Sequence, residues 1–483
     1  MMKTFKVECK VITPLFMRGA NQQAELRTQS INGLLRWWFR IAGGSIEDEK
    51  RLFGWAGEKS NQGLVRIKIE REEFNATEQI EENQKIADEI LRLLEKRKDE
   101  LEREIETAKE YQKNKLLKRK RYIEIQIKKV KEILEKLKIA KNNSQEFSED
   151  LLKEIQKLIF LLEGYRYLGF SLEMNDRDFK LVGLTFDLKI SFHPKSNEED
   201  IKKFFCALWL AFNLGNFGSR SRRGFGAIRI KEIKIEKIKE DGKEDYEYIT
   251  NNCYGLSFAP SGDLGTWINK NLNEIKKVLN QPRKDIPNLF DNFEIYQIQK
   301  DNFSNWKNWI AQVQEGRQGK YLKNSWGGNN VSDWKDLLDF MGFLLMAYRS
   351  YRPPDYDNAK KILRGNNLNT PTFKRAIFGI PLNFFYSSLK NPRTGKKGYG
   401  DMVNLKQGKE TTLRRASPLM LKILQVDNQY EGLFIVAKST TFMPQNSRID
   451  FHGISVQFPQ NIWKAIDEFI NTLKNKSIIK EIL

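Results

Sequence analysis

Four segments in the first 240 residues alternate apolar and polar side chains with a period of two, which is the pattern of a half-buried strand. These segments are residues 3–12, 63–70, 181–192 and 227–238. The strict alternation at 5–11 (FKVECKV) predicts a strand at the N-terminus rather than a signal peptide.

Two helices are predicted between these strands. The first runs from Ile31 to Ala42, with Ser30 as its cap, and the second follows a capping box of Ser196 and Glu199 and carries one apolar stripe. The resulting order is β-α-β, an interruption, and β-α-β. This order predicts an α+β, ferredoxin-like unit of four antiparallel strands with two helices on one face, which leaves the other face open for a ligand.

The interruption, residues 71–165, differs in composition from the rest. Its stretch 71–141 contains no Gly or Pro, and residues 71–110 carry a net charge of −6, whereas residues 111–141 carry +9. Opposite charges on two helical arms predict an antiparallel hairpin whose faces attract each other. The hairpin is either a solvated spacer or, through the basic cluster 118–121, a contact for a nucleic acid or a partner.

The second half repeats the theme less clearly. Predicted strands lie at 253–260, 293–298, 377–386, 419–426 and 433–440, and predicted helices at 266–279, 333–350 and 461–473. The polar stretch 239–252 makes the best boundary. We therefore expect a first domain at 1–245, which contains the helical insertion, and a second α+β domain of the same kind at 246–483.

Composition narrows the class of protein. The 483 residues include 83 Lys+Arg against 63 Asp+Glu, for a net charge of +20, and the hairpin contributes only +3 of it, which leaves +17 for the remaining 412 residues. Such a surplus favours polyanionic partners. Three scattered Cys and no CxxC motif argue against a disulfide framework or a zinc cluster, and the apolar runs are too short for a membrane helix. We expect a cytoplasmic protein without membrane contact, metal or cofactor.

The strongest chemical signal is the loop at 215–230, GNFGSRSRRGFGAIRI. Its glycines allow close approach of backbone to a ligand, and its arginines are suited to phosphates. The predicted RNA-binding residues here are Gly218, Arg220, Arg222, Arg223, Gly224 and Phe225. Residues 223–230 partly match the octamer of RNA-recognition motifs, in which Phe225 would stack on a base. No Walker A or dinucleotide motif occurs, so no nucleotide cofactor is expected. The alternative is a glycine-rich turn with solvated arginines.

Other basic and aromatic residues are candidates for the same groove. In the first helix, Arg36 and Arg40 share one face and either follow phosphates or pair with acidic residues of another element, while Trp37 is a stacking candidate. Arg18 and Arg27 in the preceding loop could face this groove. In the second half, Lys374, Arg375, Arg414 and Arg415 are candidates for a second phosphate track, and the alternative is that they are solvated surface residues.

Four blocks of the sequence, taken together, resemble the RAMP superfamily of CRISPR-associated proteins. The blocks are 12–44, 218–230, 378–385 (FGIPLNFF) and 414–421 (RRASPLML). They are similar to the first-numbered RAMP subunit of the Cmr, or type III-B, effector complex. The resemblance implies two ferredoxin-like RAMP domains and a non-catalytic role in antiviral defence. In that role the subunit binds the 3′-end side of CRISPR RNA (crRNA) and captures single-stranded target RNA, together with the other Cmr-complex subunits.

The alternative function is a metal-independent RAMP endoribonuclease that processes CRISPR RNA. Such a reaction needs a general base and a proton donor, and histidine suits both roles. The chain has only His193 and His452, and each is expected to shape a turn. Clustered carboxylates for a metal-dependent nuclease are not visible, so we expect a binding protein rather than an enzyme.

Overall fold

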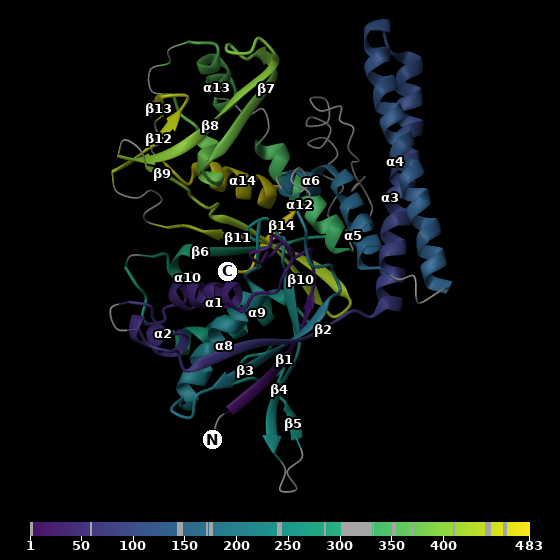
Figure 1. Cartoon of the computed structure of the whole chain (residues 1–483). Helices are drawn as coiled ribbons and strands as arrows, with labels where there is room; N and C mark the ends of the chain where they lie inside the picture. The colour runs from purple at the N-terminus through teal and green to yellow at the C-terminus, as the bar shows by residue number, and fades with distance from the viewer. Residues whose placement is uncertain are drawn as a thin grey trace.

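The computed structural model describes residues 3–57, 60–142, 148–170, 172, 177–238, 244–284, 286–300, 331, 333–349, 354–366, 368, 371–408, 411–439, 446–456 and 461–483 (Figure 1). Its first sheet is antiparallel with the strand order β2-β3-β1-β4-β5. The strands are β1 (Lys3–Val11), β2 (Val65–Glu73), β3 (Thr185–Phe192), β4 (Ile228–Ile238) and β5 (Glu244–Tyr248). Helices α1 (Thr28–Ile41) and α8 (Glu198–Asn213) pack against each other and share a core with one face of this sheet.

A second sheet repeats the same arrangement. Its strands are β6 (Phe293–Ile298), β10 (Leu419–Val426), β11 (Gln429–Ala437) and β14 (Ile479–Glu481), and its helices are α12 (Trp334–Arg349) and α14 (Lys464–Asn475). The order β10-β11-β6-β14 is equivalent to β2-β3-β1-β4 of the first sheet. The chain therefore contains two ferredoxin-like units, and the predicted fold class is confirmed.

Each unit carries an insertion. In the first unit it lies between β2 and β3, and in the second it lies between α12 and β10 and between β11 and α14. In the first unit, α3 (Ala76–Thr107) and α4 (Glu110–Asn142) form a long hairpin that stands at the side of the molecule in Figure 1. Lys120 pairs with Glu102 (2.8 Å) and Lys131 with Glu95 (3.1 Å), so the two arms attract each other as the charge pattern predicted. The segment continues as α5 (Glu149–Leu158), the 3₁₀ turn Ile159–Leu161 and α6 (Glu163–Leu168).

The insertion in the second unit is a small β-lobe, of which the sequence predicted only the strand at 377–386, which overlaps β7 (Leu382–Lys390). It consists of α13 (Asp355–Leu363), the 3₁₀ helix η4 (Lys374–Phe378), β7 (Leu382–Lys390), β8 (Lys397–Gln407), β9 (Thr411–Leu413), β12 (Ser447–Phe451) and β13 (Ile454–Val456). Its strand order is β13-β12-β8-β7, with β9 paired to β8, and it has a core of its own. The remaining helices are α2 (Ile46–Phe53), α9 (Leu264–Val278) and α10 (Leu289–Asn292).

Several predicted boundaries are wrong in detail. Helix α1 begins at Thr28 rather than after Ser30, and the capping box of α8 is formed by Asn197 and Asp200, one position beyond the predicted pair. The predicted strand at 253–260 is instead a tight turn, because Tyr254 has a φ of +53°.

Three further predicted boundaries, at residues 245, 350 and 440, lie at or near residues outside the described part of the chain. The first sheet continues past residue 245 through β5, whereas residues 239–243 lie outside the described part of the chain. The helix end predicted at Ser350 and the strand end predicted at Thr440 also lie outside it.

A buried lysine joins the two units. The Nζ atom of Lys422, on β10, donates hydrogen bonds to the carbonyl oxygens of Phe212 (2.7 Å) and Gly215 (2.6 Å) at the C-terminus of α8. The carbonyls at this end of a helix have no partner within the helix and favour a cation. Lys422 is 0% exposed, and burial lowers its pKa to about 7.

Helix α12 connects the hairpin to the centre of the molecule. Near its start, Lys335 is 2% exposed and pairs with Glu89 of α3 (2.6 Å) as well as with Asp333 (3.0 Å). In its middle, the Oδ1 atom of Asp339 accepts hydrogen bonds from the backbone N–H groups of Gly164 (2.7 Å) and Tyr165 (2.9 Å) at the start of α6. The same helix thus holds both parts of the first insertion.

In the described residues, no helix is long and apolar enough to cross a lipid bilayer.

Replacing Lys422 with Met should remove a pH-dependent part of the stability. The pKa of about 7 in the folded chain is below the ordinary value of 10.5, so the unfolded chain binds more protons between these two values. The wild type should therefore gain stability relative to Lys422→Met as the pH rises above 7, by up to about 1.4 kcal/mol per pH unit. Urea unfolding at pH 7, 8 and 9 measures this difference. Lys128→Met on the exposed face of α4 is the control, and a pH-independent difference for Lys422→Met would contradict the assignment.

Candidate nucleic-acid interface

The glycine- and arginine-rich loop lies between α8 and β4 and is held by hydrogen bonds from both units. The hydroxyl of Thr13 donates to the carbonyl oxygen of Gly224 (2.8 Å) and accepts from the N–H of Ala227 (2.9 Å). From the second unit, the N–H of Leu421 donates to the carbonyl oxygen of Arg222 (3.2 Å). The loop is therefore fixed on both sides before any ligand binds.

Two glycines of the loop are required by its geometry. Gly218 has a φ of +79°, and a Cβ atom there would lie 2.7 Å from the carbonyl oxygen of Phe16. Gly224 has a φ of +85°, and a Cβ atom there would lie 2.4 Å from the Leu338 side chain. Gly224 is buried, so it serves the packing of the second unit rather than the predicted approach of a ligand.

The side chains of the loop point to two sides. Ser219, Ser221 and Gly218 line a pocket next to α1, and Arg222 lies over the ring of Trp37 at 5.6 Å. On the other side, Arg220 and Arg223 lie among charges from the second unit and from the segment after α6.

This second side is a cluster of like charges, which we call the arginine cluster. Its members are Arg177, Arg220, Arg223, Arg349 and Arg375. Burial and the charge of Arg349, followed by that of Arg220, lower the pKa of Arg223 to about 10. Burial and the charge of Arg177 lower the pKa of Arg220. Cations that lower one another's pKa are held together at a cost in free energy, which a bound anion would offset.

Aromatic rings position two members of the cluster. The guanidinium of Arg349 lies 5.3 Å from the ring centre of Phe378 and 5.9 Å from that of Tyr167. Arg349 is 7% exposed, and its Nε atom has no hydrogen-bond partner within the described residues. Arg375 lies 4.5 Å from the ring centre of Phe384.

Arg375 is also held by a carboxylate. Its Nη1 donates to the carbonyl oxygen of Arg349 (2.6 Å), and its backbone N–H donates to Asp355 (2.7 Å). Burial lowers the pKa of Arg375, and the charge of Arg349 adds to this effect, whereas Asp355 opposes it. The backbone N–H of Lys374 also donates to Asp355 (2.9 Å). Arg375 thus lies beside Arg349 of α12, and contact of the basic pair 374–375 with RNA stays a prediction.

The pair Arg414 and Arg415 follows β9. The backbone of Arg415 exchanges hydrogen bonds with Ile380 (2.8 and 2.9 Å), which places it beside η4. Burial and the charge of Arg415 lower the pKa of Arg222 to about 10, so Arg415 lies near the loop. Arg414 is exposed.

Arg36 and Arg40 are engaged elsewhere. Both pair with Glu49 of α2, at 2.8 Å and 2.5 Å, and Glu49 is only 3% exposed. Burial alone would raise the pKa of Glu49, but hydrogen bonds from Arg40 and Arg36 outweigh it and lower the pKa. Arg36 and Arg40 thus pair with an acidic residue of another element, which was the alternative that the sequence left open. RNA contact by these two arginines stays a prediction, and the ion pairs argue against it.

Phe225 does not have the predicted role. Its side chain is 0% exposed and packs edge-on against Phe16 and Tyr165, with ring centres 5.7 and 5.1 Å apart. A base cannot stack on a fully buried ring. The partial match to the RNA-recognition octamer was misleading because the loop is covered by α6 and the second unit.

The open face of the first sheet also differs from the expectation of a ligand-binding surface. Its cations pair with carboxylates on the same face: Lys6 with Asp187 (3.1 Å), Lys189 with Glu236 (3.0 Å), and Lys231 with Glu8. The positive surplus is therefore not on this face.

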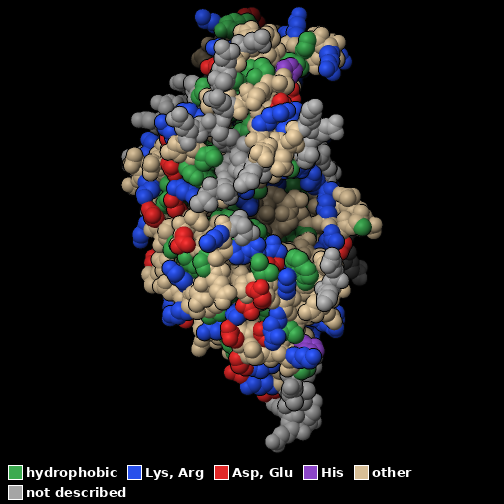
Figure 2. All heavy atoms as spheres, turned by 90° about the vertical axis from the view of Figure 1, so that its left-hand side faces the viewer, with side chains coloured by type: hydrophobic (Ala, Val, Ile, Leu, Met, Phe, Trp, Pro, Cys, Tyr) green, Lys and Arg blue, Asp and Glu red, His purple; other side chains and the backbone are tan. Residues whose placement is uncertain are grey.

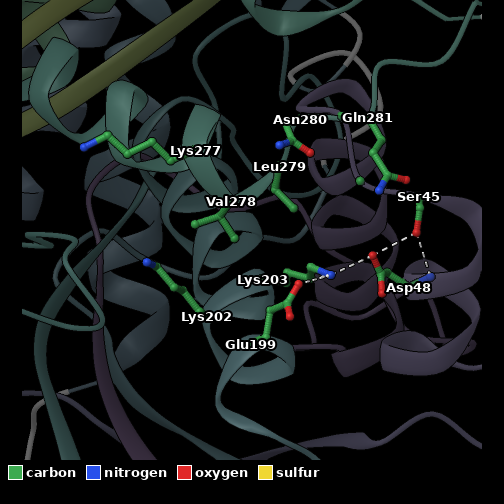
Figure 3. Close-up of a pocket in the computed structure, with 12 residues that line it drawn as sticks. Ser45, Asp48, Glu199, Lys202, Lys203, Lys277, Val278, Leu279, Asn280 and Gln281 are labelled. Carbon is green, nitrogen blue, oxygen red and sulfur yellow. Dashed lines mark hydrogen bonds and ion pairs between the residues drawn. The ribbon is translucent and has the colours of Figure 1, made fainter.

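Figure 2 shows a hollow at mid-height on one face of the molecule, with Lys and Arg side chains around it. A separate pocket of about 290 Å³ lies between α2, α8 and α9 (Figure 3). Lys203 points into it, but its amine is held between Asp48 (2.9 Å) and Glu199 (2.7 Å). The charge of Lys203 is therefore already balanced within this pocket.

The two histidines lie in turns, as expected. His193 accepts a hydrogen bond from the N–H of Lys195 (3.2 Å) just after β3. His452 has a φ of +53° in the β12–β13 hairpin, and its Nδ1 lies 2.6 Å from Asp401 and its Nε2 3.4 Å from the hydroxyl of Tyr399. Sequence reasoning missed this contact between distant residues. Among the described residues, no group of three or more His, Cys, Asp or Glu is placed to hold a metal ion.

Sequence reasoning also missed Arg177, Arg349 and Tyr167. None of them belongs to a glycine-rich or repeated basic motif. Only the packing of α6 and α12 against the loop brings them together, so no local pattern could have identified them.

Comparison with known proteins shows which protein family the chain resembles. Residues 8–229 match the model of the RAMP superfamily. The CRISPR system Cmr subunit Cmr1-2 of Pyrococcus furiosus is 24% identical over 237 residues, which are 47% of this chain and 95% of that protein. The resemblance of residues 8–229 to the RAMP superfamily, which the motifs indicated, is therefore confirmed. The curated relative makes the chain similar to Cmr1.

Solved structures align over nearly the whole chain at low similarity. Apo Cmr1 from Pyrococcus furiosus is 13% identical with a TM-score of 0.44, and the alignment covers 99% of this chain and 98% of that one. The type III-B Cmr-beta complex bound to cognate target RNA contains a chain that is 13% identical with a TM-score of 0.40, covering 99% of this chain and 100% of that one.

Replacing Arg36 and Arg40 with Met should lower stability and leave RNA binding unchanged. The double variant removes the two closest cations of the buried Glu49 and leaves Arg283 at 3.9 Å, which costs about 3 kcal/mol in the free energy of unfolding. Adding Glu49→Leu removes the stranded carboxylate and should restore most of that loss. Urea unfolding and the salt dependence of RNA binding are measured in parallel. Unchanged stability with a flatter salt slope would instead place the two arginines on RNA.

Proposed function

We propose that this chain is the non-catalytic, RNA-binding subunit of a type III-B CRISPR (Cmr) ribonucleoprotein in the cytoplasm. In this role it binds the 3′-end side of crRNA and captures single-stranded target RNA for antiviral defence, next to other Cmr-complex subunits. The name of the Pyrococcus furiosus relative, a Cmr subunit, supports membership of the complex.

The observation that carries the proposal is the arginine cluster. Arg220 and Arg223 from the first unit meet Arg349 and Arg375 from the second, and the charges of these side chains depress the pKa values of their neighbours. A phosphodiester backbone supplies anions at a regular spacing, so it would relieve this repulsion at several positions at once. Guanidinium groups fixed by aromatic rings lose little entropy when they bind a phosphate.

The shape of the site favours single-stranded RNA. Arginines lie on two sides of the loop, and the half-buried ring of Trp37 stands under Arg222, which matches the combination of backbone charge and stacking used for single strands. The alternating ion pairs on the open sheet face offer no comparable track for a duplex.

Replacing Arg223 and Arg349 with Gln should weaken RNA binding and its dependence on salt. Each phosphate lost from a single strand lowers the slope of log K against log salt by about 0.7, so the double variant should be flatter by about 1.4. The matched control removes two lysines that are already paired on the open sheet face, Lys68→Ala and Lys189→Ala, and should keep the wild-type slope. Binding of a labelled single-stranded RNA at several salt concentrations measures both. Equal slopes for the wild type and the Arg223, Arg349 variant would refute the proposal.

The second candidate function is a metal-independent endoribonuclease, and one observation favours it. Asp401 fixes the ring of His452, and Tyr399 lies on its other nitrogen, which is the arrangement of an oriented general base. Asp401 is the cross-strand partner of Phe384, the ring under Arg375, so the carboxylate that holds His452 lies on the strand pair β7–β8, which borders the arginine cluster. The positive φ of His452 explains its position in the hairpin without catalysis.

A cleavage assay separates the two functions. A labelled single-stranded RNA is incubated with the protein in EDTA and in Mg²⁺ and then run on a denaturing gel. We expect salt-sensitive binding with intact RNA, because both ring nitrogens of His452 are already engaged by Asp401 and Tyr399. Cleavage that persists in EDTA and disappears in His452→Ala, but not in His193→Ala, would establish the endoribonuclease instead.

A further inference from the structure

A pocket of about 520 Å³ opens between helix α1 and the inner side of the glycine- and arginine-rich loop. Its walls come from three places in the chain: residues 16–18 after β1, residues 30–37 of α1, and residues 216–221. The volume falls in the range of sites that hold small molecules. Three independent features indicate what the pocket binds.

The first feature is a glycine within a helix. Gly33 lies in the second turn of α1, where glycine is less favourable than alanine. A Cβ atom at this position would meet nothing within 4 Å, so internal packing does not require the glycine. Gly33 lines the pocket and leaves the helix backbone bare on that side. An object outside the chain that approaches α1 closely would account for it.

The second feature is a buried acceptor without a donor. Asn216 is 5% exposed and lines the pocket, and its Nδ2 donates to the carbonyl oxygens of Ser221 (2.6 Å) and Leu421 (2.8 Å). These two bonds fix the amide, and its Oδ1 atom is buried with no hydrogen-bond partner among the described residues. An unpaired buried acceptor is costly, so a donor from a ligand is expected there.

The third feature is an aromatic wall with a cation above it. Trp37 is half-buried, and its ring packs edge-on against Trp38 with centres 5.0 Å apart. Arg222 covers it at 5.6 Å and bonds to the carbonyl oxygen of Ser417. Both contacts hold the indole in place, so little freedom is lost when a flat ring stacks on it.

From these features we infer that the pocket holds one unstacked nucleotide of single-stranded RNA. The base stacks on Trp37, the ribose lies over Gly33, and a hydroxyl or amino group of the nucleotide donates to Asn216. The neighbouring phosphates pass over the loop to Arg220 and Arg223 on its other side. This inference rests on the proposed function and adds to it a contact with a base, which the arginine cluster alone does not make.

Photo-crosslinking tests the inference directly. Single-stranded RNAs, each with one 4-thiouridine at a different position, are bound to the full chain, irradiated, and analysed by mass spectrometry. Crosslinks from one RNA position should fall on residues 30–37 or 216–221. Wild-type crosslinks that map only to other segments would overturn the inference.

Substitutions at Gly33 give a graded control. Gly33→Leu fills the pocket with a good helix former, and it should abolish the crosslink and weaken RNA binding about tenfold, the loss of one stacked base. Gly33→Ala adds only a Cβ atom, so it should keep the crosslink and raise the melting temperature. A crosslink that survives Gly33→Leu would exclude the pocket.

The same samples distinguish failure of the pocket from failure of the proposed function. If the wild type binds RNA with a salt slope that depends on Arg223 and Arg349, but Gly33→Leu changes nothing, the nucleotide pocket is wrong and the RNA-binding function stands. If the salt slope does not depend on the arginine cluster, the proposed function fails. Complete displacement of the crosslink by micromolar uridine monophosphate would assign the pocket to a free nucleotide and overturn the inference.

Discussion

The arrangement of the molecule depends on the contact between the end of α8 and strand β10. Lys422 donates hydrogen bonds to two carbonyl oxygens at this helix end. Just after the helix, the side chain of Asn216 donates to the carbonyl oxygen of Leu421 on β10. Because the glycine- and arginine-rich loop starts here, its position is fixed by the second unit as much as by its own. Without this contact the arginines of the loop would extend into solvent, where mutual repulsion would spread them apart. Their close grouping is therefore a property of the two units together.

Charge is distributed unevenly over the fold, and the net value of the chain conceals this. The hairpin and the open face of the first sheet contain many cations, yet most of those with an identified contact are paired with a carboxylate nearby. The loop region has fewer cations, but several of them lie close enough to other cations to lower one another's pKa. Cations paired with carboxylates support the structure, whereas cations that lower one another's pKa at a cost in stability are typical of a site that binds an anion. This contrast, rather than the total of +20, distinguishes the interface.

Most of the first ferredoxin-like unit could be predicted because its strands and helices have strong periodicity, as at 181–192 and 31–42. Of the β-lobe, only the strand at 377–386, which overlaps β7, was predicted; β8 was missed because it contains Gly398 and Gly400 and alternates weakly. At the site, local motifs identified Arg220, Arg222, Arg223 and Arg375. The roles of Phe225, Arg36 and Arg40 were not predictable, since burial under α6 and pairing with Glu49 are tertiary effects. Arg349 was missed for the same reason, because its significance comes only from its neighbours.

Helix α12 has a consequence for communication within the protein. Lys335 near its start is locked to Glu89 of the hairpin, and Arg349 at its end lies in the arginine cluster. The helix has 16 residues and so spans about 24 Å. One helix therefore carries both the residue that holds the hairpin and a member of the arginine cluster. A neighbouring molecule that displaced the hairpin would act on the same helix that positions Arg349.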